Sequence, residues 1–127
     1  MDRQTAENLL AECELHALIG LELSEWSEGL VVFRFAPPQS VRHEGGVHGG
    51  ALSTALDTAA TFALISSIDG DASTVDLRVD FMRPALDAEF RVEGRTKRAG
   101  RRLGWADAEL TNAEGRLIAV ARGTFAW

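Results

Sequence analysis

One segment dominates the sequence: residues 45–68, GGVHGGALSTALDTAATFALISSI, carry a single formal charge, Asp57. The regions on either side are much richer in charged residues. Burying an unpaired carboxylate is costly, so an apolar segment keeps one only where a partner or a chemical task holds it there. Two glycines follow His48. They predict that a helix begins there, close to the same region, and that its first residues have no side chains. We interpret Asp57 and this helix start as a candidate active site.

The composition is that of one folded domain, residues 1–127, since 46% of its residues are hydrophobic and can form a core. A formal net charge of −6 argues against a dedicated nucleic-acid binder. Residues 91–102 depart from this balance, with six Arg or Lys against one acid. This basic cluster either meets the phosphates of a ligand or is a solvated hairpin, and the sequence leaves both interpretations open.

Several features favour a soluble, cytoplasmic protein. The single cysteine, Cys13, excludes an internal disulfide framework and fits a reducing compartment. The first residues lack the charged and apolar regions of a signal peptide. The apolar run at residues 51–65 is too short to span a bilayer and is interrupted by polar side chains.

Periodicity predicts an α+β fold. An amphipathic helix is expected over residues 3–18 and a long helix over about residues 50–66. Expected strands lie at residues 29–36, 75–81, 89–93, 102–111 and 117–127. Apolar and polar residues alternate in the strand at 75–81, which is therefore expected to be half-buried. The apolar run of the last strand is continuous enough for it to be central and covered on both faces. Strands grouped after one helix indicate a long helix lying across a curved antiparallel sheet.

The long helix has two distinct faces. One stripe is apolar and is placed on the sheet: Leu52, Leu56, Ala59 and Ala63. The far side holds Ser53, Asp57 and Thr61, with Ala60 and Leu64 among them. A monomer would be expected to carry Lys or Glu on that side, and the helix carries neither. We therefore expect a second subunit to cover it, in an obligate homo-oligomer.

Three motifs lie at a characteristic spacing: Val47–Leu52 (VHGGAL), Leu56–Ala59 (LDTA) and Val79–Pro84 (VDFMRP). Together they resemble the hotdog-fold acyl-CoA thioesterases of the phenylacetic-acid-degradation (PaaI) type, over roughly residues 20–127. The resemblance implies a long central helix wrapped by an antiparallel sheet of about five to six strands. It also implies a homodimer, often paired into a tetramer, with active sites at the subunit interface, an acyl-CoA substrate, and neither a cofactor nor a metal.

The chemistry of thioester hydrolysis fits these residues. Unpaired N–H groups at a helix start stabilise charge on a carbonyl oxygen, and glycine at Gly49 lets that carbonyl approach. Asp57 lies eight residues further along, about 12 Å at 1.5 Å per residue. Gly49 of one subunit is therefore expected to face Asp57 of the other. Asp57 would act as general base or as nucleophile, or would be a structural acid bonded to the partner's backbone.

Other candidate residues surround these two. His48 either orients the loop and polarises the carbonyl or simply caps the helix. Thr74 falls where some relatives place a hydroxyl facing the acid, although an ordinary strand threonine is the alternative. A metal site built from His43, His48 and Asp57 is not supported, because the spacing matches no established ligand pattern.

Arginines are the candidate contacts to coenzyme A. Arg42 stands where many relatives have an asparagine, so it is expected to meet either the thioester or a phosphate. Gly50, at the helix start, is a further candidate contact to the substrate. In the family, the coenzyme A nucleotide lies near surface basic residues. The corresponding candidates here are Arg83, Arg98, Arg101 and Arg102.

Two competing functions are a hotdog hydratase or dehydratase, which the His-Gly-Gly…Asp spacing disfavours, and a non-catalytic acyl-CoA binding subunit, which Arg42 keeps open. The acyl group is not defined by the sequence. Phe62, Trp105 and Trp127 line a pocket for it or belong to the core.

Overall fold

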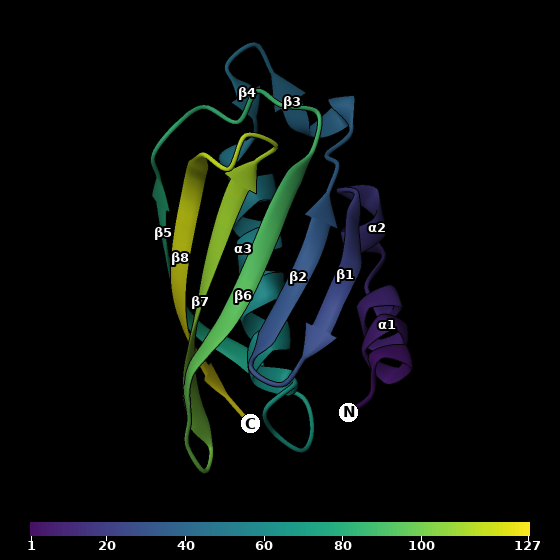
Figure 1. The fold of residues 1–127 in the computed structure, drawn as a ribbon, viewed down its shortest axis with the longest axis vertical. Helices are drawn as coiled ribbons and strands as arrows, with labels where there is room; N and C mark the ends of the chain where they lie inside the picture. The colour runs from purple at the N-terminus through teal and green to yellow at the C-terminus, as the bar shows by residue number, and fades with distance from the viewer.

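The computed structural model describes residues 1–127 (Figure 1). The helices are α1 (Arg3–Glu12), α2 (Glu14–Leu18) and α3 (Gly49–Ile65), with a short 3-10 turn at Gln39–Val41. The strands are β1 (Leu21–Ser27), β2 (Leu30–Phe35), β3 (Arg42–His43), β4 (Gly46–Val47), β5 (Ser73–Phe81), β6 (Phe90–Ala99), β7 (Leu103–Asn112) and β8 (Leu117–Ala126). None of the helices combines the length and the apolar character that crossing a membrane requires.

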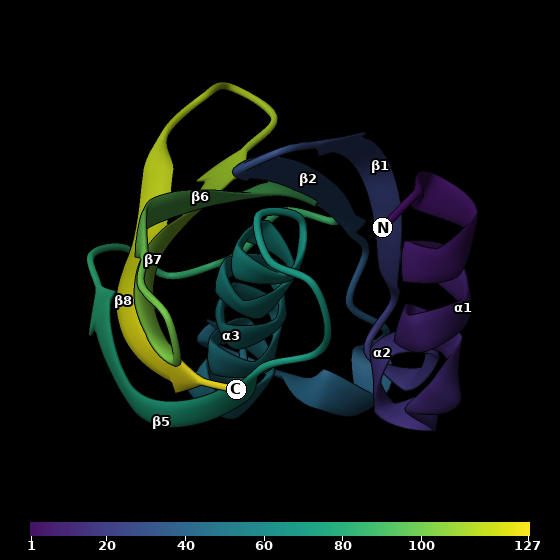
Figure 2. The same ribbon diagram turned by 90° about the horizontal axis from the view of Figure 1, so that it is seen from below.

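Six strands form one antiparallel sheet in the order β1-β2-β6-β7-β8-β5, and β3 pairs separately with β4. The sheet curls around α3 on one side, and α1 and α2 lie beyond the β1 edge (Figure 2). The side of α3 turned away from the sheet lies between β5 and α2. The predicted α+β hotdog architecture, one long helix wrapped by a curved antiparallel sheet, is confirmed.

Helix α3 packs closely against the sheet. The predicted stripe of Leu52, Leu56, Ala59 and Ala63 is buried as expected. Contact with β6 is so close that a Cβ on Gly94 would lie 1.9 Å from the Ala59 carbonyl oxygen. Ala60 and Leu64, expected on the far side, are also fully buried, because the sheet curls further around the helix than a flat sheet would. Phe62 belongs to the core, with its ring packed edge-on against Phe33 and Trp26.

The N-terminal helix predicted over residues 3–18 is two helices. Cys13 adopts an extended conformation (φ −104°, ψ 108°), which ends α1 and starts α2. Ala6 and Leu10 face the core, whereas Cys13 is exposed. Across this break, Nδ1 of His16 in α2 contacts the carbonyl oxygen of Leu10 in α1. Gly20 follows with φ +79°, a conformation that favours glycine.

Three strand predictions need correction. The sequence analysis missed β1, whose short LELSEWS run buries only Leu21 and Leu23. β5 is more exposed than a half-buried strand, because it lies at the sheet edge and pairs only with β8. β8 is central, as predicted, but only one of its faces is buried: Ala119, Ala121 and Phe125 point inward, while Arg122 is exposed.

Candidate active site

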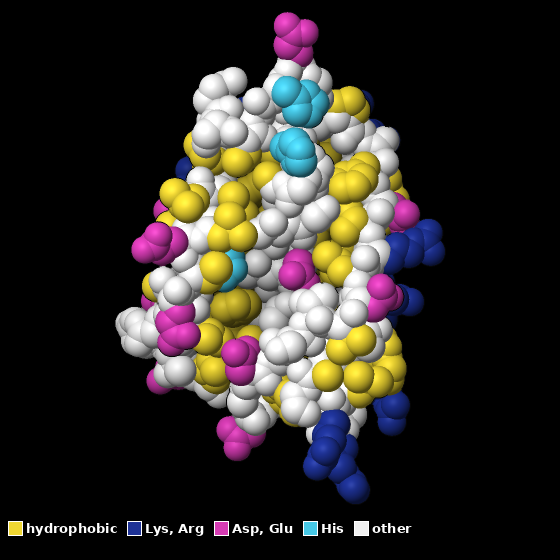
Figure 3. Space-filling view, turned by 180° about the vertical axis from the view of Figure 1, so that it is seen from behind, with side chains coloured by type: hydrophobic (Ala, Val, Ile, Leu, Met, Phe, Trp, Pro, Cys, Tyr) yellow, Lys and Arg dark blue, Asp and Glu magenta, His cyan; other side chains and the backbone are white.

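The side of α3 that faces away from the sheet is a strip of half-exposed small polar residues around one acid: Ser53, Thr54, Asp57 and Thr61. Figure 3, which views the molecule from this side, shows hydrophobic side chains along both margins of a largely uncharged central band. The hydroxyls of the strip all bond to carbonyls one turn earlier: Ser53 to Gly49 (2.8 Å), Thr54 to Gly50 (2.9 Å) and Thr61 to Asp57 (2.7 Å). The hydroxyls have thus committed their protons, and Asp57 is the one side chain of the strip that offers a charged group to a ligand.

Asp57 is held by a residue of the edge strand. The Oγ1 hydroxyl of Thr74 donates a 2.8 Å hydrogen bond to Asp57 Oδ1, while Oδ2 has no partner within the protomer. Burial raises the pKa of Asp57 above its ordinary value, and the Thr74 hydrogen bond and the charge of His16 oppose that rise. A raised pKa brings the carboxylate closer to the basicity that proton abstraction near neutral pH requires.

His16 is a neighbour of this acid that the sequence analysis missed. Its Nδ1 lies 2.8 Å from the carbonyl oxygen of Leu10, so Nδ1 carries a proton and donates. The contact lies across the break at Cys13, where α1 ends and α2 starts. A histidine on an amphipathic helix gives no sign in the sequence of which distant residue it will meet.

The start of α3 presents a single free donor. The Nδ1 atom of His48 accepts from the Gly50 N–H at 2.9 Å. The N–H groups of Ala51 and Leu52 both donate to the His48 carbonyl oxygen, at 3.0 and 3.2 Å. The N–H of Gly49 has no acceptor within the protomer. Since amides at a helix start carry the positive end of the helix dipole, the Gly49 N–H is the donor available to an oxyanion.

These contacts assign His48 a capping role, which was one of its two predicted interpretations. Because Nδ1 accepts, the neutral ring carries its proton on Nε2. Gly50 was predicted to bind substrate, but its N–H is already occupied by His48. A Cβ on Gly49 would lie 3.3 Å from the Phe81 ring, so glycine here makes room for an aromatic side chain that is itself half-exposed.

Two of the predicted ligand-binding arginines are engaged by backbone carbonyls. Arg42 donates from Nε to the Pro37 oxygen (3.1 Å) and from Nη2 to the Ala88 oxygen (3.2 Å). Arg83 donates from Nη1 to the Leu117 oxygen (2.8 Å). Both arginines thus hold loops together at this end of the molecule.

The basic cluster divides into two parts. Arg91 and Arg95, at the hairpin base, form ion pairs with Glu93. Arg98, Arg101 and Arg102 surround the β6–β7 turn, are exposed, and form no ion pair within the protomer. That turn lies at the end of the molecule opposite the start of α3 (Figure 1). The free arginines and the Gly49 N–H of one protomer are therefore at opposite ends.

The edge strand β5 is unprotected. One side of it pairs with β8, and the other presents free backbone N–H and C=O groups. Large hydrophobic side chains accompany that edge: Val75 is 62% exposed, Phe81 53% and Met82 51%. A free edge beside apolar side chains is a surface suited to pairing with another chain.

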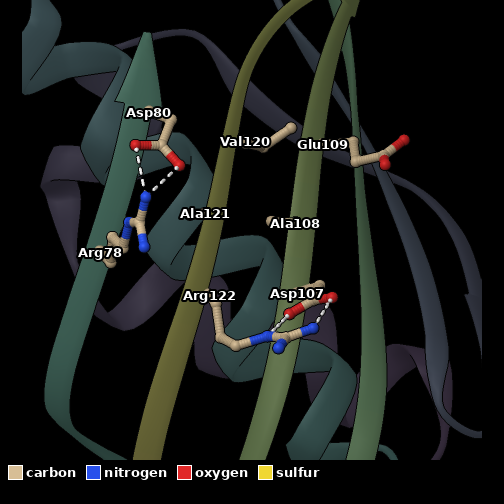
Figure 4. Close-up of a pocket in the computed structure, with 8 residues that line it drawn as sticks. All are labelled: Arg78, Asp80, Asp107, Ala108, Glu109, Val120, Ala121 and Arg122. Carbon is tan, nitrogen blue, oxygen red and sulfur yellow. Dashed lines mark hydrogen bonds and ion pairs between the residues drawn. The ribbon is translucent and has the colours of Figure 1, made fainter.

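The outer face of the sheet offers a different kind of hollow, of about 370 Å³. Figure 4 shows charged side chains standing on β5, β8 and β7, on the side of the sheet away from α3. Arg122 donates two hydrogen bonds to Asp107 (2.6 and 2.8 Å), and Arg78 lies 3.3 Å from Asp80. Because both arginines already have carboxylate partners, we do not assign the site to this face.

Comparison with known proteins finds relatives that match most of the chain. Residues 44–119 match the family described as Thioesterase superfamily. A Saccharolobus solfataricus protein named "Putative esterase SSO1253" is 30% identical over 92% of this chain and 79% of its own length. The "Medium/long-chain acyl-CoA thioesterase YigI" of Escherichia coli is also 30% identical, over 84% of this chain and 81% of its own.

Solved structures show the same fold. The conserved protein PA5202 of Pseudomonas aeruginosa superposes with a TM-score of 0.84 at 31% identity, covering 90% of this chain and 93% of that one. The PaaI protein of the Escherichia coli phenylacetic acid degradation operon gives a TM-score of 0.89 at 22% identity, over 97% of this chain and 90% of that one. At 22% identity, the second likeness concerns the fold alone.

Proposed function

This chain belongs to the thioesterase superfamily, and from that membership we propose that it hydrolyses acyl-CoA thioesters to a free acid and coenzyme A. The observation that carries the proposal is that two polar groups on α3 have no partner within the protomer. Asp57 has one free carboxylate oxygen on an otherwise uncharged strip, and Gly49 has the one free N–H at the helix start. A base or nucleophile and an oxyanion donor are the two elements that acyl transfer needs.

In the proposed reaction, the thioester carbonyl oxygen accepts the Gly49 N–H. Asp57 Oδ2 either takes a proton from a water whose oxygen attacks the carbonyl carbon, or attacks that carbon itself to form a mixed anhydride that water then hydrolyses. The carbon–sulfur bond breaks, and the coenzyme A thiolate leaves and is protonated. Thr74 keeps Oδ1 in place, so that Oδ2 faces the reacting carbon.

The proposed site is shared between two copies of the chain. Asp57 lies eight residues after Gly49, about 12 Å along a helix at 1.5 Å per residue, which is too far for both to meet one carbonyl. Two antiparallel α3 helices, packed through these strips, place Gly49 of one copy against Asp57 of the other. The free edge of β5 and its exposed hydrophobic side chains support this pairing.

The same arrangement provides a position for coenzyme A. Antiparallel pairing moves the β6–β7 turn of one copy toward the α3 start of the other, so Arg98, Arg101 and Arg102 are the proposed contacts to its phosphates. The paired arrangement is that of the PaaI type, to which we assign the chain. The name of the YigI relative favours an aliphatic acyl group of medium or long chain.

Thiol release tests this proposal. The purified protein should release free coenzyme A from a panel of acyl-CoA substrates, and Asp57→Asn should lower turnover at least about a hundredfold while keeping fold and oligomer. Asp69→Asn, at an exposed acid that follows α3, is the matched control and should leave turnover unchanged. Water addition or loss without thiol release would identify a hydratase instead, and binding without turnover a non-catalytic subunit.

A further inference from the structure

A cavity of about 350 Å³ lies between α2 and the first turns of α3. Its apolar lining comes from three parts of the chain: Leu15 on α2 with Ile19 directly after that helix, Val41 at the end of the 3-10 turn, and Ala51 on α3. Ile19 and Ala51 are buried, whereas Leu15 is 46% exposed and stands at the rim. The volume falls within the range of small-molecule pockets, about 300–1,000 Å³.

The cavity lies at the start of α3, on one side of Gly49, and Gly49 itself lines a second hollow together with Phe81. His48 and Gly50, the residues on either side of Gly49, both line the cavity. A thioester whose carbonyl oxygen accepts the Gly49 N–H therefore has its acyl carbon next to the cavity.

Several polar groups in the lining are engaged within the chain, and the others, on Ser40, His43 and His48, belong to exposed residues. The Thr54 hydroxyl donates to the Gly50 carbonyl, Arg42 donates to two loop carbonyls, and Nδ1 of His43 accepts from the Gly45 N–H. No buried side-chain nitrogen or oxygen in the chain is left without a partner. An apolar ligand that packs against the apolar part of the lining therefore meets no buried polar side chain without a partner.

We propose that this cavity binds the aliphatic chain of the acyl group, and that Leu15 and Ile19 select its length. The inference rests on the proposed thioesterase function and names its substrate class. Both residues lie outside residues 44–119, the part that matches the superfamily, so this chain's own N-terminal segment supplies the selection. Each methylene buried there should improve binding about fourfold, until the cavity is full.

The test compares two substitutions on the same helix. Leu15→Trp places a larger side chain at the rim of the cavity, where partial exposure lets the fold accommodate it. Leu18→Trp is the matched control, because Leu18 is 66% exposed and does not line the cavity. The measurement is kcat/KM for saturated acyl-CoA substrates from acetyl to palmitoyl.

Leu15→Trp should lower kcat/KM at least about tenfold for chains of eight or more carbons and leave acetyl-CoA within about twofold, since only long chains need the cavity. Leu18→Trp should follow the wild type at every length. An equal loss at all lengths, or no loss at any, would overturn the assignment.

A binding measurement separates this inference from the proposed function. Dodecyl-CoA and ethyl-CoA thioethers cannot be hydrolysed, and calorimetry gives their affinities whether or not the protein turns over a thioester. Wild-type protein should prefer the dodecyl compound, and Leu15→Trp should abolish the preference. If the wild-type protein releases no thiol but still prefers the dodecyl compound, the proposed thioesterase activity is contradicted and the proposed role of the cavity is supported. Equal affinities of the wild-type protein for the two thioethers would refute acyl-chain binding in the cavity and would leave the proposed thioesterase activity untouched.

Discussion

Thr74 on the edge strand donates a 2.8 Å hydrogen bond to Asp57 on the central helix, and this contact joins the proposed interface to the proposed chemistry. The donor stabilises the charged carboxylate and so lowers the pKa of Asp57. Thr74→Val removes this donor. The fall of kcat/KM on the acidic side of its pH profile, the acid limb, should therefore move to higher pH. Thr74→Ser keeps a hydroxyl and should hold the limb in place. Identical profiles for the two variants would show that the hydroxyl does not act on Asp57.

Asp57→Asn should stabilise the fold in a pH-dependent way. Burial raises the folded-state pKa of Asp57, so ionised Asp57 reduces the free energy of unfolding at any pH above that raised pKa. Below the unfolded pKa of about 3.9 the acid is protonated in both states, and the effect disappears. Urea unfolding at several pH values should find the variant more stable than the wild type at pH 7 and equal to it near pH 3.5. A variant that is less stable at pH 7 would contradict the burial argument.

His48 should act through its cap on Gly50. Removing an N-cap acceptor costs about 1 kcal/mol, and asparagine is itself a favoured N-cap. His48→Ala should therefore lower the free energy of unfolding by about that amount, and His48→Asn should restore most of it. Chemical denaturation of the three proteins measures both effects. Equal losses in the two variants would assign His48 to a role other than capping.

The free arginines of the β6–β7 turn should affect substrate binding more than chemistry. Replacing Arg101 and Arg102 with glutamine should raise KM for acyl-CoA severalfold and leave kcat nearly intact. Acyl-pantetheine lacks the nucleotide and should be unaffected. Salt should mimic the substitutions, since exposed charges are screened over about 8–10 Å at physiological ionic strength.

Arg78→Gln together with Arg116→Gln removes the same formal charge elsewhere on the surface and is the matched control. Equal losses on acyl-CoA and acyl-pantetheine would show that the turn supports the fold or the interface and does not contact the ligand.

The central helix and its acid could be predicted because their signals are local. The 3.6-residue period of the apolar stripe and the isolation of Asp57 are both visible within residues 45–68. Apolar and polar residues alternate strongly along β5, but this alternation does not reveal whether a strand lies at a sheet edge. Its exposure follows from the sheet order, which depends on every other strand.

The features that were missed depend on long-range contacts. The proximity of His16 to Asp57 requires the break at Cys13, and nothing in that residue type predicts a break. The engagement of Arg42 by the carbonyls of Pro37 and Ala88 depends on a loop 46 residues further along the chain. Such contacts are set by tertiary packing, which no local pattern encodes.

Subunit complementation tests the shared site most directly. Asp57→Asn removes the base or nucleophile. Gly49→Pro removes the N–H, at the first helical position, which tolerates proline; His48 before it is already extended (φ −56°, ψ 132°). Each variant alone should be inactive as a folded oligomer. Their mixed dimer should contain one site with an intact Asp57 and an intact Gly49 on different chains.

The measurement is thiol release from an acyl-CoA after the two variants are unfolded together in equal amounts and refolded. Random pairing makes half of the dimers mixed, each with one working site of two, so the account predicts about a quarter of wild-type turnover. A mixture as inactive as its separate components, with mixed dimers demonstrated by a tag on one variant, would contradict a site shared between Asp57 and Gly49 of different subunits.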